Sequence, residues 1–433
     1  MIYRMEKSTF ACIIADSVKS IYILFEGWKG EELDKSIVFQ KVKQLTLRKK
    51  YQMKKTALLV ALSFCLLGNK VKAQDTRVIT TAVPFLMITP NSKAAAMGEA
   101  GVATTPDANS MFWNASKLAF VEKDAGISIS YAPWLQNLVD DVNLTYISGF
   151  YRLNDKSTLG ASLKYFSLGS ITFRESAEVP GYHFNPNEYA FDVGYALQLS
   201  KRLSGGLAFR FIYSDLLGNT QSSSGDAASE GTSLAADISA YYTSKTFDLQ
   251  GKDARYKLGL NISNIGNKIT YSTSGDEDFI PANLRIGSSL EIDIDEYNAV
   301  NFALDFNKLL VPTPPLNSDE EDPFGDTGVI EGVFNSFSDA PAGDSELREI
   351  NVSLGAEYWY NKQFAFRGGY FYEHETKGNR QYLTFGAGLK MQVLSIDVSY
   401  LVPTTTDVHN PLKNTIRFSL NFDLDAFRSS SEG

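Results

Sequence analysis

The residue types that most often carry chemistry are scarce in this chain. It has three histidines, His183, His374 and His409. Only His374 lies between two carboxylates, Glu373 and Glu375, which could form an acid–base pair or a set of metal ligands. A hydrolytic site would also need an activated nucleophile, and the sequence has no G-x-S-x-G motif. We therefore interpret these residues as solvated loop charges and predict no catalytic residue.

Metal and cofactor sites are not predicted either. Acidic residues cluster at Asp226 with Glu230 and at residues 276–278, but neither cluster has the spacing of an EF-hand. Weak calcium binding at these loops is an alternative to ordinary solvated charge, which we favour. Both cysteines, Cys12 and Cys65, precede residue 74, so the rest of the chain has no disulfide or thiolate site.

The net charge of −9 is unevenly divided along the chain. Residues 1–73 contain 14 basic and 6 acidic residues, which leaves 27 of the 41 basic and 44 of the 50 acidic residues for the remainder. The remainder therefore carries a net charge of −17. A body this acidic argues against nucleic acid as a partner.

From Gly126 onward, the chain alternates between apolar and polar residues, which is the pattern of strands with one apolar face. The clearest case is the last run, in which Ile416, Phe418 and Leu420 alternate with Arg417 and Ser419. About fourteen such runs occur, an even number, as bacterial single-chain barrels require. Their centres are Ile129, Tyr146, Leu163, Val193, Phe209, Ile238, Leu260, Gly287, Leu304, Leu354, Phe366, Phe385, Ile396 and Leu420.

The connections between these runs alternate between long and short. Those after odd-numbered strands are generally long, as at residues 167–188 and 310–346, and those after even-numbered strands are mostly short, as at residues 154–156. Outer-membrane barrels have short periplasmic turns and long external loops. We therefore expect an outer-membrane barrel with both termini in the periplasm.

The charged residues of the strands bear on the choice between a membrane barrel and a soluble one. They fall on the face opposite the large apolar residues, as Asp192, Arg210, Asp237, Glu357 and Arg367 do. In a soluble barrel the apolar side chains would fill the core. We favour the reverse arrangement, with apolar side chains facing lipid and charges facing the lumen. The reason is that the lumen must also hold residues 81–120, which we expect to lie inside the barrel as a plug.

Residues 81–120 form the predicted plug. The segment follows neither the strand period nor the helix period, it is rich in alanine and glycine, and Pro84, Pro90 and Pro106 interrupt regular structure. It has no apolar face of its own, so we expect it to fold only inside surrounding walls. Small residues should be needed for its fit; the plug residues that we single out are Ala95, Gly98, Gly101, Trp113 and Asn114.

The same residues carry a resemblance. The run AVPFLMITPNSKAAAMGEAGVATTPDANSMFWNASKLAF resembles the N-terminal signature of the PorV family, outer-membrane proteins of the type IX secretion system within the FadL-like barrel superfamily. The resemblance extends from about Asp75 to the C-terminus. The family usually has Asn-Pro where this chain has Asn114-Ala115.

The resemblance implies a carrier and docking protein. Such a protein receives cargo with a C-terminal signal domain from the translocon barrel and passes it to the cell-surface sortase and attachment complex. Besides these partners it would contact outer-membrane lipid. The alternative is a FadL-like channel for small hydrophobic compounds. Because a channel of that kind needs an apolar lumen or a lateral opening, the charged inward positions favour the carrier.

The N-terminal 73 residues are interpreted as lying outside the mature protein. Residues 53–73 have a basic start, a short apolar run and Val71-Lys72-Ala73 before Gln74, which together predict a signal peptide. Residues 1–52 are interpreted as an upstream extension, with a long leader as the alternative. The predicted division is therefore extension 1–52, signal peptide 53–73, plug 74–123 and barrel 124–428.

The long loop at residues 310–346 is the most informative one. It has nine acidic residues between Asp319 and Glu346, and no Lys or Arg occurs between Lys308 and Arg348. Within it, four apolar residues have the spacing of one face of a short helix; they are Ile330, Val333, Phe334 and Phe337. They are candidates for binding a partner, and the equally weighted alternative is that they pack over the mouth of the barrel.

Overall fold

The computed structural model describes residues 78–136, 139–173, 181–216, 218, 229–271, 277–314, 327–340, 346–405 and 412–425. All of them belong to one compact unit, Asp75–Gly433. The predicted extension and signal peptide, and the end of the predicted barrel at residues 426–428, lie outside the described residues. No helix in the described ranges is both long and apolar enough to cross a membrane.

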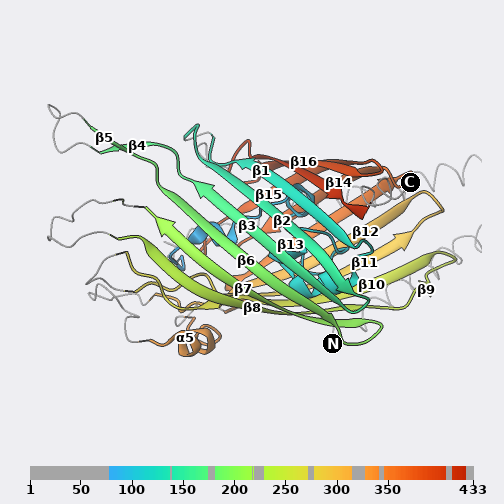
Figure 1. The fold of residues 1–433 in the computed structure, drawn as a ribbon. Coiled ribbons are helices and arrows are strands. Elements are labelled where there is room, and N and C mark those ends of the chain that lie inside the picture. Colours follow the sequence, from blue (N-terminus) through green and yellow to red (C-terminus); the bar gives the residue numbers. More distant parts are fainter. Residues whose placement is uncertain are drawn as a thin grey trace, which may run out of the picture. The chain divides into compact units, whose positions relative to one another are not determined.

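Fourteen antiparallel strands form a closed barrel, as the sequence predicts (Figure 1). Each strand pairs with its neighbours along the chain, and the barrel closes because the first strand also pairs with the last. All fourteen predicted centres fall within these strands. The strands are β1 (Ala125–Pro133), β2 (Asn143–Asn154), β3 (Ser157–Ser167), β6 (Asn187–Gln198), β7 (Leu203–Asp215), β8 (Gly231–Thr243), β10 (Asp253–Gly266), β11 (Asn283–Asp293), β12 (Ala299–Leu309), β13 (Ile350–Tyr360), β14 (Phe364–Tyr372), β15 (Gln381–Lys390), β16 (Leu394–Pro403) and β17 (Ile416–Asp423).

Three further short strands lie at the rims. β4 (Ile171–Phe173) and β5 (Tyr182–Phe184) pair with each other in the connection between β3 and β6. The two-residue β9 (Phe247–Asp248) adds to the start of β10. None of the three is part of the closed wall.

Alternation along the strands places apolar side chains outside and polar ones inside. In β7, Phe209 is 68% exposed whereas the next residue, Arg210, is 7% exposed. Outward-facing Leu234, Phe302 and Phe366 are likewise exposed, while Asp305 is buried on the lumen side. A wall that is apolar outside and polar inside is that of a transmembrane barrel. The soluble alternative is wrong, because the large apolar side chains do not form the interior.

The connections differ in length between the two rims. One rim carries short turns such as residues 155–156 and 361–363, and the other carries long connections such as residues 168–186 and 310–349. We call them the short-turn rim and the long-loop rim. Because Leu424 N donates to Ala125 O, the end of β17 and the start of β1 meet at the short-turn rim.

The plug lies inside the barrel, in agreement with the prediction. It contains four short turns of helix, η2 (Pro84–Met87), α3 (Ser92–Ala95), α4 (Ser110–Trp113) and η3 (Ala115–Phe120), drawn in blue to cyan within the barrel in Figure 1. Pro84 begins η2 at the position where its missing N–H costs nothing. Met97, Ala100 and Leu118 are fully buried, and they cluster with apolar residues of the wall. The barrel wall therefore supplies the surroundings that the sequence requires.

Glycines of the wall make room for the plug backbone. A Cβ atom on Gly355 would lie 2.6 Å from the carbonyl oxygen of Met97, and a Cβ atom on Gly369 would overlap the backbone of Gly98. The wall thus has no side chains at these positions, and the plug backbone passes directly against it. Close packing of this kind leaves no space for a larger residue on either side.

The connection between β12 and β13 contains two helical segments at the long-loop rim. They are α5 (Val329–Asn335) and the short η4 (Glu346–Glu349) that leads directly into β13. α5 begins after Gly328, and its last turn is closed by Ser336, whose hydroxyl donates to Val333 O at 2.8 Å. The short helix expected from the spacing of Ile330, Val333 and Phe334 is confirmed.

Candidate functional site

The plug is fastened to the wall by hydrogen bonds to its backbone. The carboxylate of Asp305 in β12 accepts from the N–H groups of Gly101 at 2.6 Å and Val102 at 2.9 Å. The N–H of Gly98 donates to the hydroxyl of Thr384 in β15 at 2.9 Å. These bonds satisfy plug donors that no helix or sheet could satisfy, so the wall fixes the path of the plug.

Asn114 connects two parts of the plug with the wall. Its side-chain oxygen accepts from Ser116 N at 3.1 Å and thereby caps η3. Its amide nitrogen donates to Val102 O and, at 3.0 Å, to Ala240 O of β8. Ala115 occupies the first position of η3, where proline is also favoured. The departure from Asn-Pro in this chain therefore leaves the turn intact.

The other predicted plug residues are all at close contacts, but at different places. The indole N–H of Trp113 donates to Asn91 at 2.9 Å, and its ring covers Gly101, where a Cβ atom would overlap it. Ala95 is fully buried in α3, which packs against β15, β16 and β17. Gly98 lies against β13 and β14. The five residues line the plug–wall boundary and do not form one ligand site.

Two of the buried ion-pair groups of the lumen are built around an arginine. Arg210 bridges Asp192 at 2.6 Å and Asp237 at 3.1 Å across β6, β7 and β8. A second group across β13, β14 and β16 has the same design: Arg367 bridges Glu357 and Asp397, each at 2.6 Å. The inward direction of most of these charges was predicted from alternation. Their pairing was not, although two partners directly opposite each other, such as Asp192 and Arg210, are a detectable signal once the register is known.

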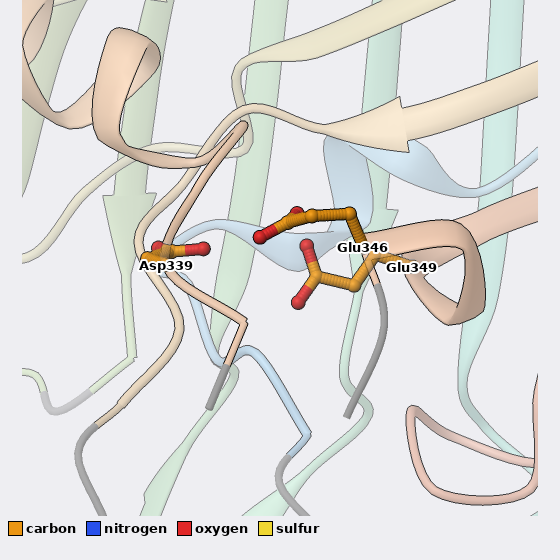
Figure 2. Close-up of side chains that lie close together, drawn as sticks. All are labelled: Asp339, Glu346 and Glu349. Atoms are coloured by element: carbon orange, nitrogen blue, oxygen red, sulfur yellow. The ribbon is translucent and has the colours of Figure 1, made fainter. Parts of the chain in front are cut away.

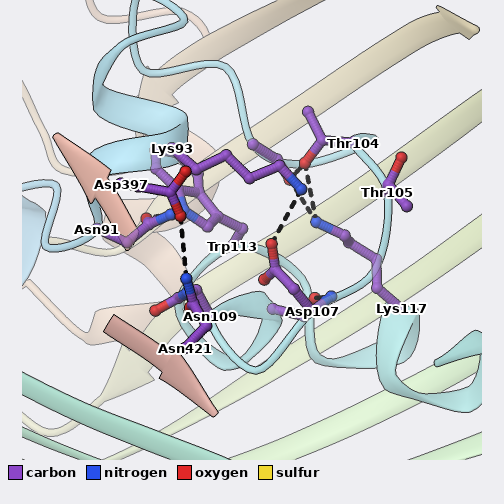
Figure 3. Close-up of polar contacts among 12 residues, drawn as sticks. Asn91, Lys93, Thr104, Thr105, Asp107, Asn109, Trp113, Lys117, Asp397 and Asn421 are labelled. Carbon is purple, nitrogen blue, oxygen red and sulfur yellow. Dashed lines mark hydrogen bonds and ion pairs between the residues drawn. The ribbon is translucent and has the colours of Figure 1, made fainter. Parts of the chain in front are cut away.

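A cavity of about 530 Å³, lined by polar and apolar residues, opens at the short-turn rim between the plug and the wall. We call it the vestibule. Figure 3 shows plug residues Lys93, Asp107 and Asn109 beside Asp397 and Asn421 of the wall. Lys93 pairs with Asp107 at 3.1 Å, Asn109 donates to Asn421 at 3.2 Å, and Asn421 donates to Asp397 at 3.0 Å. Sequence reasoning missed the vestibule, because its lining comes from both ends of the chain.

The candidate partner-binding residues lie at the opposite, long-loop rim. Ile330 is 61% exposed, Phe334 71% and Phe337 48%, while Val333 is half-buried. α5 contacts its surroundings through Gly332, which packs against the ring of Phe279. The two predicted alternatives, partner binding and packing onto the barrel, therefore describe different sides of the helix. The glycine side packs back onto the rim, and most of the apolar side chains face outward.

A buried charge cluster anchors this loop to the barrel. Lys308 at the end of β12 pairs with Glu349 and, at 3.0 Å, with Glu346, and Lys377 pairs with Glu349 at 2.9 Å. Thr313 donates to Glu349 at 2.8 Å. Burial alone would raise the pKa of Glu349, but the hydrogen bonds from Lys308, Lys377 and Thr313 outweigh it and hold the pKa below its ordinary value.

Figure 2 shows that three carboxylates of this loop converge: Asp339, Glu346 and Glu349. Acidic trios of this kind can hold a metal ion. Here the lysine ammonium groups already bind two of the three carboxylates, and Asp339 accepts from Thr313 N at 2.7 Å. The arrangement is that of a structural anchor.

The histidine that sequence reasoning considered is hydrogen-bonded to a nearby threonine. Within the described ranges, His374 Nδ1 contacts Thr376 Oγ1 at 2.9 Å. Glu373 is 5% exposed and pairs with Arg380 at 2.7 Å, so its interpretation as a solvated charge is wrong. It stays buried because Arg380 compensates its charge. His409 lies outside the described residues, as do Asp226 and Asp276.

Solved structures that resemble this one include toluene transporters. The toluene transporter TbuX of Ralstonia pickettii is 13% identical, with 76% of this chain and 96% of that chain covered and a TM-score of 0.41. The toluene transporter TodX of Pseudomonas putida is 11% identical, with 76% and 95% covered and a TM-score of 0.42. A FadL homologue of Pseudomonas aeruginosa is 12% identical, with 80% and 99% covered and a TM-score of 0.38.

No curated protein sequence matches the chain. The family model described as type IX secretion system protein PorV matches residues 71–316, which is more than half of the 433 residues. The match covers the plug and the wall from β1 to β12. The chain belongs to the PorV family of type IX secretion system proteins.

Proposed function

We propose that this protein is a carrier and docking protein of the outer membrane. It receives cargo with a C-terminal signal domain from the translocon barrel and passes it to the cell-surface sortase and attachment complex. It acts by binding, without a catalytic step. The observation that carries the proposal is the long-loop rim, where an anchored helix presents exposed apolar side chains.

The geometry of α5 supports docking. Ile330 and Phe334 of α5, and Phe337 just after it, are exposed, while Gly332 packs α5 against Phe279. Exposed apolar clusters on an otherwise acidic loop mark interaction sites. Because the helix is anchored, little ordering entropy is lost when a partner binds.

The lumen supports a carrier over a channel for small hydrophobic compounds. The plug crosses the lumen and is bonded to Asp305 and Thr384, and the wall around it carries the Arg210 and Arg367 ion-pair groups. An apolar solute that passed through the lumen would have to separate these ion pairs, and it could offer the separated charges no new partner. The rival function therefore requires a large rearrangement of the plug.

The orientation and processing follow from the same proposal. We place the long-loop rim outside the cell and the short-turn rim in the periplasm, since outer-membrane barrels have long external loops. Both ends of the barrel sequence are then periplasmic. The mature protein is proposed to begin at Gln74, with plug 74–123 and barrel 124–428. Its intact mass tests this, and a mass that includes residues 1–52 would contradict it.

The test of function is deletion and replacement of the gene. Without the protein, cargo with a C-terminal secretion signal should accumulate inside the cell with the signal uncleaved, while uptake of small hydrophobic compounds should be normal. Normal secretion together with lost uptake of a hydrophobic compound would replace the carrier by the channel.

Replacement by a triple variant sharpens the test. Changing Val333, Phe334 and Phe337 together to Ser should leave the barrel folded but weaken capture of cargo in a pull-down from solubilised outer membrane. The control is Tyr297→Ser, which removes an exposed aromatic residue from the short-turn rim. If the triple variant captures and secretes cargo as well as this control does, α5 is only a lid.

A further inference from the structure

The plug enters the barrel from the long-loop rim. Its first described residues, Val78 to Ala82, lead into η2, and Ala82 N donates to the carbonyl oxygen of Phe279 at 3.0 Å. Phe279 belongs to the connection between β10 and β11 at that rim. The other end of the plug reaches the short-turn rim, where Lys123 pairs with Asp423 at 2.8 Å. The plug therefore crosses the lumen, and its start, drawn in blue, lies at the same end of the barrel as α5 (Figure 1).

Phe279 joins this entry segment to α5. Its backbone accepts the hydrogen bond from Ala82, and its side chain, which is 8% exposed, packs against the helix. Gly332 is the buried residue of α5, and a Cβ atom there would lie 2.9 Å from the Phe279 ring and 3.4 Å from Pro312. At that spacing the backbone of the helix rests directly on the ring. One residue therefore contacts the plug and the helix at the same time.

The entry segment is itself held firmly at this rim. Val83 and Phe85 are each 1% exposed, in an apolar cluster that includes Ile280, the chain neighbour of Phe279. Phe85 lies parallel to Phe166 at the end of β3, with ring centroids 6.3 Å apart. Val83 has a φ angle of +45°, which a β-branched residue rarely adopts. Such a conformation persists only where the surrounding contacts impose it, so these contacts fix the entry segment.

The charge cluster at Glu349 holds the chain that follows α5, whereas the helix itself packs through Gly332. We propose that Phe279 is a positioning residue for docking, which holds α5 in place while the seated plug holds Phe279. The inference rests on the proposed function, in which α5 binds cargo, and it adds a regulation of that surface. A barrel whose plug is not seated at the long-loop rim displays α5 in the wrong place, so only the completed carrier captures cargo.

The competing account is that the charge cluster at Glu349 positions α5 without Phe279. The two accounts predict opposite effects of one methyl group. Alanine is favoured over glycine inside a helix by about fivefold in the equilibrium constant. Gly332→Ala should therefore tighten α5 if the charge cluster alone holds it. If Phe279 positions the helix, the added Cβ atom meets the ring and should displace α5.

The test measures how quickly a thiol on α5 of the full barrel in detergent reacts with a maleimide. Residues 74–433 have no cysteine, so Val333→Cys, at a half-buried position, gives a single reporter once Cys12 and Cys65 are changed to Ser. Gly332→Ala should speed the labelling by about fivefold, because overpacking against the ring outweighs the helix propensity of alanine. Gly328→Ala is the matched control, since nothing lies within 4 Å of a Cβ atom there, and it should leave the labelling rate unchanged.

Removing the ring should abolish the effect of the added methyl group. Phe279→Ala should itself speed the labelling, and Gly332→Ala added to it should cause no further increase. The heat-modifiable band in SDS gels confirms that each variant is folded. If Gly332→Ala acts equally in both backgrounds, or slows the labelling when Phe279 is present, Phe279 does not position the helix.

The plug side of the link is tested by removing one N–H group. Ala82→Pro deletes the donor to Phe279 O and should speed labelling of the reporter, because the residue that supports α5 loses its bond to the plug. Thr80→Pro makes the same change at an exposed position of the entry segment and should have no effect. Equal labelling of the two proline variants would separate α5 from the plug and overturn the proposal.

Capture of cargo in a pull-down separates this inference from the proposed function. The variants that label faster, without the reporter cysteine, should capture less cargo than the wild type and the Gly328→Ala control. Faster labelling with normal capture would contradict α5 as the docking surface, while the positioning by Phe279 would stand. Unchanged labelling of Gly332→Ala would overturn the positioning and leave the docking proposal intact.

Discussion

At the scale of single residues, the plug depends on positions where no side chain fits. Gly98 has a φ angle of +65°, which L-residues with side chains rarely adopt. A Cβ atom there would lie 2.5 Å from Leu354 O and 2.6 Å from Tyr370 N. Both neighbours are backbone atoms of the wall, so neither can move aside without breaking the sheet.

Gly98→Leu should therefore destabilise the folded barrel by about 3 kcal/mol or more, since overpacking and left-handed strain add. The measurement is thermal unfolding, together with the loss of the compact, heat-modifiable band in SDS gels. Gly328→Leu is the control, because nothing lies within 4 Å of a Cβ atom at Gly328. An unchanged melting temperature for Gly98→Leu would mean that the plug does not rest in the lumen.

Residues of this kind show where sequence reasoning succeeds and where it stops. Alternation placed Arg210 and Asp237 on the lumen side, because a two-residue period is local information. It did not reveal that Arg210 bridges two carboxylates, since Asp192 and Asp237 lie on the two strands beside β7 and meet Arg210 only in the observed register. The need for small plug residues was predicted, but the matching glycines of the wall, such as Gly355 and Gly369, were not.

At the scale of elements, the connection between β12 and β13 combines an exposed helix with a buried anchor. The helix could be predicted, because Ile330, Val333 and Phe334 have helical spacing. The anchor could not, because Lys308 and Lys377 are separated from η4 in the sequence and meet it only when β12, β13 and β14 pair. The position of α5 is thus set by residues outside its own segment.

The anchor should weaken in acid. The pKa of Glu349 is held below its ordinary value of 4.5, so its ion pairs stabilise the loop fully above about pH 4.5. The stabilisation is lost as the pH falls below that value and the carboxylate is protonated. Cleavage of the 310–349 connection by pepsin, compared between pH 5 and pH 3, measures the loss.

Glu349→Gln should show the loosened loop at both pH values. Glu331→Gln is its control, because Glu331 is exposed on α5 and lies outside the charge cluster. If the cleavage rate of the wild type does not change with pH relative to that of Glu349→Gln, the cluster does not anchor the loop.

At the scale of the whole molecule, the difference between the rims sets the expected topology. On intact cells, proteinase K should cut within residues 319–346 and spare the turn at 154–156. In permeabilised cells the protease can reach this turn, in which Asp155 is exposed, and the turn should be cut. Cleavage at the turn in intact cells, with the long loop protected, would invert the orientation.

The hydrogen bond between Ser92 N and the hydroxyl of Ser419 joins residues 327 positions apart. During synthesis the plug leaves the ribosome before any barrel strand, yet this anchoring residue belongs to the last strand. The part of the plug around Ser92 therefore reaches its final bonds only when β17 is in place. Contacts of such sequence separation make folding slow, and the small apolar residues of the plug must be shielded from aggregation in the meantime. The first part of the described chain to be made is among the last to reach its place, so that completion of the barrel and seating of the plug become a single event.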